Sequence, residues 1–252
     1  MSLKKNIVYS SILTVSGYLF PFITFPYVTR VLGVENFGIC SFYDSILTYF
    51  TLISMMGMST LGIREIASCK GDKDKLCSVF SSLFSLNLIA TVIALLLMLG
   101  SALFVNKFQE HPQMMLIGAA KLLANFFMIE WFFRGIEEFQ YVTVRSILVR
   151  AVYVVSVFIF VRQSEDYLLY FLLTALMFVV NAAINMLYVR RFVTLTFSNI
   201  RITNYIRPFI VFGAYQILTS MYTSFNVAYL GFVSSDTEVG YYLSLIHIPS
   251  PR

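Results

Sequence analysis

Charged residues are scarce in this 252-residue sequence. Only 12% of the residues are Asp, Glu, Lys or Arg, whereas 58% are apolar and the mean hydropathy is +0.78. A soluble domain of this length needs a charged surface, so the composition excludes one. Because hydrocarbon offers no hydrogen-bond partner to a free backbone, long apolar runs indicate membrane-spanning helices. The predicted fold class is an all-α polytopic membrane protein.

Groups that support catalysis, metal binding or secretion are also missing. The three cysteines, Cys40, Cys69 and Cys77, form no CxxC or other metal-ligand spacing. The first apolar run continues to Val28 without a small-x-small cleavage site, so we expect an anchored helix rather than a signal peptide. The loops are short, and no carboxylate cluster accompanies His111. We therefore expect no enzyme activity, no metal and no cofactor.

Seven apolar stretches, whose ends are defined to within about four residues, are long enough to cross a bilayer, for which about 20 residues suffice. They are residues 7–29, 39–61, 76–104, 114–133, 147–161, 167–189 and 208–233.

Basic residues alternate between the two sides of this arrangement. Thirteen lie at the first end and after spans two, four and six, and three lie on the opposite side. This positive-inside pattern predicts a cytoplasmic N-terminus, and the net charge of +5 then reflects orientation and attraction to anionic lipids rather than a nucleic-acid partner. The thirteen are Lys4, Lys5, Arg64, Lys70, Lys73, Lys75, Arg134, Arg145, Arg150, Arg190, Arg191, Arg201 and Arg207, and the three are Arg30, Lys107 and Arg162.

Three ionisable residues, Asp44, Lys121 and Glu130, fall within or at the edge of the apolar stretches. An ionisable group in the membrane costs several kcal/mol unless it is paired, hydrated or facing a cavity. Lys121 lies deep in its span, so we expect it to face water, a carboxylate such as Asp44, or an anionic substrate. Arg134 follows Glu130 by four residues, and this spacing predicts a structural ion pair.

Polar residues also recur at helical spacing within the spans. The residues that share a face are Asp44, Thr48 and Thr51 in span two, Lys121 and Asn125 in span four, and Thr174, Asn181, Asn185 and Tyr188 in span six. Such stripes either pack helices together or line a polar cavity.

A short internal repeat is present. The first span ends at Leu32-Gly33 and is followed by Gly38, and the seventh ends at Leu230-Gly231 and is followed by Gly240. An even number of spans separates the copies, which predicts a parallel repeat of two six-helix halves.

Five sequence blocks follow one another along the chain, at residues 25–33, 37–38, 62–67, 130–137 and 238–242. They resemble the ordered blocks of bacterial polysaccharide flippases of the multidrug, oligosaccharidyl-lipid and polysaccharide exporter superfamily. The resemblance implies a carrier of undecaprenyl-diphosphate-linked oligosaccharide repeat units, such as O-antigen or capsule precursors, across the bacterial inner membrane. It implies lipid-linked oligosaccharide and membrane lipids as partners, with protons or sodium ions and other polysaccharide-assembly proteins as further candidates.

Members of this superfamily have about twelve helices in two lobes around a central cavity. We therefore expect residues 1–200 to form a six-helix N-terminal lobe and residues 201–243 to begin a second lobe. Residues 244–252 depart from the pattern, are broken by prolines and look like translated sequencing-adapter read-through. We expect them to be a non-native tail, and a natural truncation is the alternative.

A diphosphate requires cations, so Lys121, Arg30 and Arg64 are the predicted substrate contacts, together with three amides on the polar stripes. For the two arginines the alternative is anchoring of helix ends to lipid headgroups. Asp44 is expected to pair with Lys121 or to couple transport to an ion. The three amides are Asn125, Asn181 and Asn185.

The sequence is also compatible with two other functions. A cation-coupled multidrug exporter of the same superfamily shares the architecture and would be favoured by an acidic and aromatic cavity. A membrane-embedded enzyme of glycan assembly also handles polyprenyl carriers, but would need polar machinery in a sizeable loop.

Overall fold

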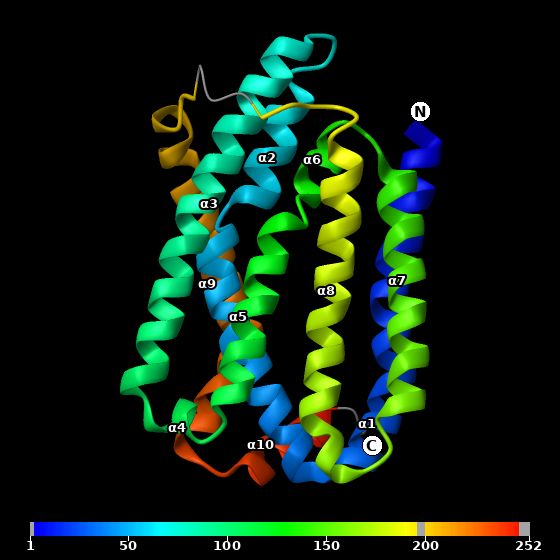
Figure 1. The fold of residues 1–252 in the computed structure, drawn as a ribbon, viewed down its shortest axis with the longest axis vertical. Helices are drawn as coiled ribbons and strands as arrows, with labels where there is room; N and C mark the ends of the chain where they lie inside the picture. The colour runs from blue at the N-terminus through cyan, green and yellow to red at the C-terminus, as the bar shows by residue number, and fades with distance from the viewer. Residues whose placement is uncertain (1–2, 196–199, 247–252) are drawn as a thin grey trace, which may run out of the picture.

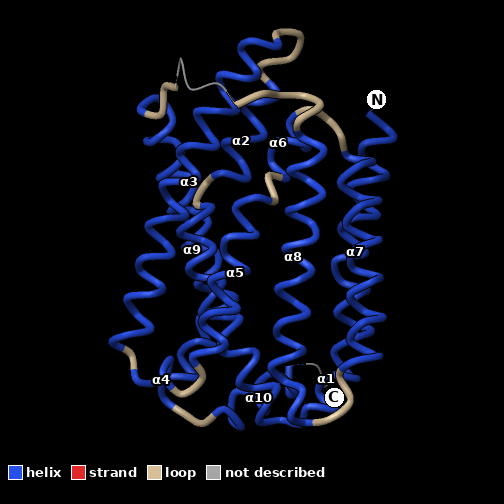
Figure 2. The backbone as a smooth tube through the Cα atoms, viewed as in Figure 1, coloured by secondary structure: helices blue, strands red, loops and turns tan. Residues whose placement is uncertain are grey.

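The computed structural model describes residues 3–195 and 200–246. The described residues form helices joined by turns and contain no strand (Figure 2), which confirms the expected all-α fold. The predicted tail, residues 244–252, lies outside the described residues from position 247 onwards. The elements are α1 (Leu3–Met55), α2 (Met58–Ala67), α3 (Lys73–Phe104), α4 (Asn106–Gln109), α5 (Pro112–Phe127), α6 (Glu130–Gly135), α7 (Phe139–Phe160), η1 (Ser164–Asp166), α8 (Tyr167–Val189), α9 (Thr203–Val233) and α10 (Asp236–Ile246).

The first helix, α1, contains two membrane crossings. At about 1.5 Å per residue, its 53 residues would extend far beyond the ~30 Å hydrocarbon core of a bilayer. The chain turns at Gly33, where φ is 76° and ψ is 172°, a conformation that is essentially restricted to glycine. Figure 1 shows the first arm running from the N-terminus to the opposite end of the bundle and the second arm returning through its middle. The predicted span 7–29 lies in the first arm, and the predicted span 39–61 covers most of the second arm and the start of α2, which begins at Met58.

Five helical stretches of the described residues are long and apolar enough to cross a membrane. They contain the first six predicted spans to within one residue, and the seventh, residues 208–233, lies within α9. The protein is therefore a multi-pass membrane protein. The five stretches are Lys4–Ala67, Lys73–Phe104, Pro112–Gly135, Phe139–Phe160 and Ser164–Val189.

One predicted boundary is wrong. The helix α7 begins at Phe139, upstream of the predicted start at residue 147, so Arg145 lies inside a membrane-spanning helix rather than in a connection. Arg150 already lies inside the predicted span 147–161. Both were wrongly counted among the basic residues of the N-terminal side. Polar neighbours hold them inside the bundle, because Glu130 accepts a hydrogen bond from Arg145 and Ser16 accepts one from Arg150.

Large apolar side chains point outwards from the bundle. Leu96 and Leu103 of α3 are 65% and 73% exposed, and Val152 of α7 is 67% exposed. Soluble monomers rarely expose apolar surface over whole helices, so these faces are suited to contact with lipid.

The two copies of the sequence repeat pack against each other where α1 meets α10. A Cβ added to Gly38 would lie 1.9 Å from the carbonyl oxygen of Asp236, and a Cβ added to Gly240 would lie 2.2 Å from that of Val34. Val34 and Asp236 each precede the glycine of their own copy by four residues, so the contact is reciprocal. Backbone-to-backbone packing of related segments explains why glycine stands at both positions.

An ion pair strengthens the same end of the bundle, which we call the Gly33 end because it also holds the turn at Gly33. The ammonium of Lys107, just after α3, lies 3.0 Å from the carboxylate of Glu110 and 3.2 Å from that of Asp236. Burial opposes the charge of Lys107, but the hydrogen bonds and charges of the two carboxylates outweigh it and raise the pKa of Lys107. The ammonium is therefore charged at neutral pH.

Replacing Gly38 by Ala is expected to destabilise the protein, since the new methyl group would overlap the backbone of α10. Overpacking of this kind costs about 1–3 kcal/mol. The matched control is Gly100→Ala in α3, where nothing lies within 4 Å of an added Cβ and the change should be neutral or stabilising by up to about 1 kcal/mol. Thermal unfolding of the purified variants, followed by circular dichroism, measures both effects. Equal unfolding temperatures would contradict the proposed backbone contact.

Candidate substrate cavity

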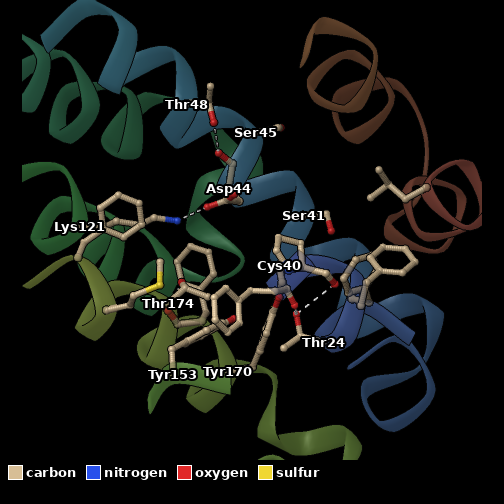
Figure 3. A pocket seen from close by; sticks show the side chains of 18 of the residues that line it. Thr24, Cys40, Ser41, Asp44, Ser45, Thr48, Lys121, Tyr153, Tyr170 and Thr174 are labelled. Carbon is tan, nitrogen blue, oxygen red and sulfur yellow. Dashed lines mark hydrogen bonds and ion pairs between the residues drawn. The ribbon is translucent and has the colours of Figure 1, made fainter. Parts of the chain in front are cut away.

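A cavity of about 580 Å³ lies among the two arms of α1 and the helices α5, α7 and α8. The helices α9 and α10 each contribute one side chain to its wall, Val227 and Leu243. Figure 3 shows polar side chains of α1, α5 and α8 directed into this space. Residues that are distant in the sequence therefore share one cavity inside a membrane-spanning bundle.

An ion pair between Lys121 and Asp44 lies in this cavity (Figure 3). The side chain of Lys121, on α5, is 15% exposed, whereas that of Asp44, on the second arm of α1, is 54% exposed. The Lys121 ammonium also lies 5.1 Å from the ring centre of Phe178 and 5.7 Å from that of Phe171, both on α8. The carboxylate and the two rings compensate its charge. Of the three partners considered from the sequence for Lys121, the structure brings Asp44 to it.

A second cation, Arg150 of α7, lines the same cavity. Its guanidinium donates hydrogen bonds to the hydroxyl of Ser16 at 2.8 Å and to the carbonyl oxygen of Leu13 at 3.5 Å, both on the first arm of α1. Among the described residues that line the cavity, Lys121 and Arg150 face a single carboxylate, Asp44. The excess of positive charge favours an anionic ligand.

The rest of the wall combines aromatic rings with hydroxyl groups. This combination suits a ligand that has both apolar faces and hydrogen-bonding groups. The rings belong to Phe20, Phe25, Phe37, Tyr153, Tyr170, Phe171 and Phe178, and the aliphatic hydroxyls to Thr24, Ser41, Ser45, Thr48 and Thr174.

The two predicted arginine contacts lie elsewhere. Arg30 is exposed near the end of the first arm of α1 and is absent from the cavity wall. Arg64, on α2, pairs with the neighbouring Glu65 at 2.7 Å, and its guanidinium carbon lies 5.5 Å from the ring centre of Phe212. Neither arginine approaches Lys121, so the geometry gives more support to their alternative role as anchors of helix ends.

The three predicted amides are also separated from the cavity. Asn181 donates a hydrogen bond to the carbonyl oxygen of Met177 in its own helix, at 2.8 Å. Asn125 lines a smaller cavity, and Asn185 belongs to a buried network between α5, α7 and α8. Helical spacing predicted a shared face for Asn181 and Asn185 but could not reveal what that face packs against.

Asn185 is fully buried and joins three helices. Its amide nitrogen donates to the carbonyl oxygen of Met128, where the chain breaks between α5 and α6. Its amide oxygen accepts hydrogen bonds from the Tyr141 hydroxyl at 2.9 Å and from the guanidinium of Arg145. These bonds give Asn185 a structural role.

Glu130 completes this network. Its carboxylate lies 3.3 Å from the guanidinium of Arg134, which confirms the ion pair predicted from their spacing. Arg145 lies closer, at 2.6 Å, and its side chain is only 3% exposed. The sequence missed this stronger partner because Arg145 comes from the next helix.

A comparison with known protein families identifies the chain's relatives. The family described as "Polysaccharide biosynthesis protein" matches residues 3–246. The chain belongs to this family. The five sequence blocks that resembled polysaccharide flippases lie within the matched region.

Two curated relatives of this polysaccharide biosynthesis protein carry the name "Putative O-antigen transporter". The one from Escherichia coli (strain K12) is 30% identical over 245 residues, which are 95% of this chain and 59% of that protein. The one from Shigella dysenteriae is 26% identical over 244 residues, 94% of this chain and 60% of that protein. The chain thus spans about three fifths of the length of these relatives. No solved structure matches the chain.

A third relative matches a smaller part of the chain. It is named "Uncharacterized membrane protein EpsK", comes from Bacillus subtilis (strain 168), and is 26% identical over 113 residues, 41% of this chain and 22% of that protein.

Sequence reasoning missed Arg150 as a cavity residue of this polysaccharide biosynthesis protein. The signal that could have found it is its spacing from Tyr153, since residues three apart share a helix face and both line the cavity. Arg150 falls inside the predicted span 147–161, but it was counted with the basic residues of the N-terminal side and was therefore not considered as a cavity residue.

The two asparagines of α8 provide a test of these assignments. Asn185→Ala would leave the buried groups of Arg145 and Tyr141 without their acceptor, which should lower the free energy of unfolding by about 2–4 kcal/mol. Asn181→Ala loses one bond within its own helix and should cost about 1 kcal/mol or less. Thermal unfolding in detergent measures the difference. An Asn185→Ala variant of normal stability would argue against the structural role.

Proposed function

We propose that this protein moves undecaprenyl-diphosphate-linked oligosaccharide units, such as O-antigen or capsule precursors, across the bacterial inner membrane. The observation that carries the proposal is the cationic cavity inside the bundle, in a chain whose relatives are named as O-antigen transporters. A buried ammonium in a membrane protein is costly to maintain, which favours a functional role for Lys121.

In this proposal Asp44 occupies the position of the substrate anion while the cavity is empty. Lys121 is the more deeply buried partner and Asp44 the more exposed one, so Asp44 is the group that can turn away. A diphosphate would then replace the carboxylate on Lys121, and the ammonium would remain neutralised throughout.

Arg150 and the aromatic wall would hold the rest of the substrate's polar part. A guanidinium offers two parallel donors to a phosphate group, and Arg150 lines the same cavity as Lys121. The rings of the wall would contact the apolar faces of sugars, while the polyprenyl chain stays in lipid.

Movement of the substrate would follow from alternating access to the cavity. The glycine contact between α1 and α10 and the Lys107–Asp236 ion pair would hold the Gly33 end closed in one state and part in the other. The N-terminus and the connection between α2 and α3 lie at the opposite end (Figure 1), which we assign to the cytoplasm because basic residues gather there.

We also propose that transport is coupled to the binding of an ion at Asp44. When the diphosphate takes Lys121, the released Asp44 carboxylate would be free to bind a proton or a sodium ion. Other polysaccharide-assembly proteins would supply the substrate and receive it after transfer.

A multidrug exporter of the same superfamily is the second candidate. The ring-rich wall of the cavity favours it, because aromatic side chains bind hydrophobic cations. Lys121 and Arg150 argue against it, since they would repel such drugs. We propose a transporter rather than a glycan-assembly enzyme, because the cavity presents cations and rings instead of an acid–base pair.

Export of lipid-linked glycan should fall about ten- to hundredfold in a Lys121→Ala variant, because a charge-assisted contact to the diphosphate is lost. The measurement is the amount of glycan that reaches the outer leaflet in cells that depend on this gene. The matched control is Lys73→Ala, which removes the same charge from an exposed position at the start of α3. Both variants must be present in the membrane at normal abundance. Unchanged export by Lys121→Ala would exclude Lys121 from the substrate site.

A further inference from the structure

A second, smaller cavity lies where two helices of the bundle are interrupted. The break between α1 and α2 includes Met56, with φ 26°, and the break between α5 and α6 includes Ile129, with φ 38°. Left-handed backbone at a branched residue such as Ile129 is costly and persists where the surrounding structure requires it. A cavity of about 190 Å³ lies between the two breaks and shares no lining residue with the larger cavity.

Three side chains that line this cavity carry a buried N–H donor with no partner among the described residues. The donors are the amide of Asn125, the indole nitrogen of Trp131 and Nε of Arg134. Trp131 is 2% exposed, and its ring is held against the backbone of Gly62, where an added Cβ would lie 2.6 Å from the indole. An unsatisfied buried donor costs about 1–3 kcal/mol, so three around one cavity indicate a site that an acceptor group completes.

The chemistry of the wall favours a neutral ligand with hydroxyl groups over an anion. The carboxylate of Glu130 lines the same cavity and would repel a phosphate. A hydroxyl group can accept from the N–H donors and donate to this carboxylate at the same time. Met55 and Ile63 supply apolar surface for the carbon face of a ring.

The smaller cavity lies near the larger one along α5. Asn125 follows Lys121 by four residues on α5, so the two side chains share a helix face about 6 Å apart along the axis. A glycan whose diphosphate is held at Lys121 could therefore reach the smaller cavity with a sugar ring.

We infer that the cavity between the two helix breaks is a sugar-binding subsite that takes a neutral hydroxylated ring of the substrate glycan. Asn125, Trp131 and Arg134 donate to its hydroxyl oxygens, and Glu130 accepts from its hydroxyl groups. This inference rests on the proposed function, because the subsite would hold part of the transported glycan.

The single tryptophan of the chain makes the subsite directly observable, because Trp131 lines it. The purified protein in lipid nanodiscs is titrated with neutral methyl glycosides (glucoside, galactoside and mannoside), and the emission of Trp131 is recorded. At least one glycoside should produce a saturable shift, and inorganic diphosphate at the same concentrations should produce none. If no glycoside gives a saturable shift, the cavity holds water only and the inference fails, as it also does if diphosphate gives the shift.

Variants of the cavity residues test whether the change in Trp131 emission comes from sugar bound in this cavity. Asn125→Asp keeps the side-chain size but replaces the donor with an acceptor, so it should weaken sugar binding about tenfold or more. Ser59→Met, at an exposed position on the rim, should block the cavity without disturbing the core. Asn36→Ala is the matched control at the Gly33 end and should bind normally. Unchanged binding in both cavity variants would overturn the assignment.

The readout is independent of transport. Lys121→Ala should lose export yet keep the Trp131 response to free glycosides. A failure of the proposed function would therefore appear as normal export by Lys121→Ala, whereas a failure of the subsite appears as a missing Trp131 response.

Discussion

The bilayer supplies no partner for a charge or a free backbone group, and this constraint organises the whole bundle. Every charge that enters the membrane region must be satisfied by another helix. The charge of Lys121 is compensated by Asp44 and two phenylalanine rings, and Arg145 pairs with Glu130 and donates a hydrogen bond to Asn185. Each of these contacts joins different helices, so charge compensation also fixes how the helices are arranged.

The two polar centres differ in how completely their groups are satisfied. Around Asn185 most donors and acceptors are paired, and the arrangement holds the break between α5 and α6 in position. Around Lys121 the carboxylate partner is half exposed and a cavity of about 580 Å³ adjoins it. A closed network stabilises one structure, whereas an open ion pair beside a cavity can exchange partners, which is what a transporter requires.

Apolar runs predicted the helices well, because the hydrophobic effect and backbone hydrogen bonding act locally along the chain. They failed at the start of α7, where Arg145 interrupts the apolar pattern although it is inside the bundle. The spacing of Glu130 and Arg134 predicted their ion pair because both lie on one helix. The closer pairing of Glu130 with Arg145 was missed because it depends on how two helices pack.

The sequence by itself determined that the chain spans a membrane, roughly where its membrane-spanning helices lie, and that Lys121 needs compensation. These properties follow from composition and from periodicity within single helices. Only the tertiary structure decided that Asp44 meets Lys121, that Arg150 shares their cavity while Arg30 and Arg64 do not, and that Asn185 lies in a separate network. Such pairings depend on helix rotation and packing, and helical spacing along one chain segment carries no information about the segment it faces.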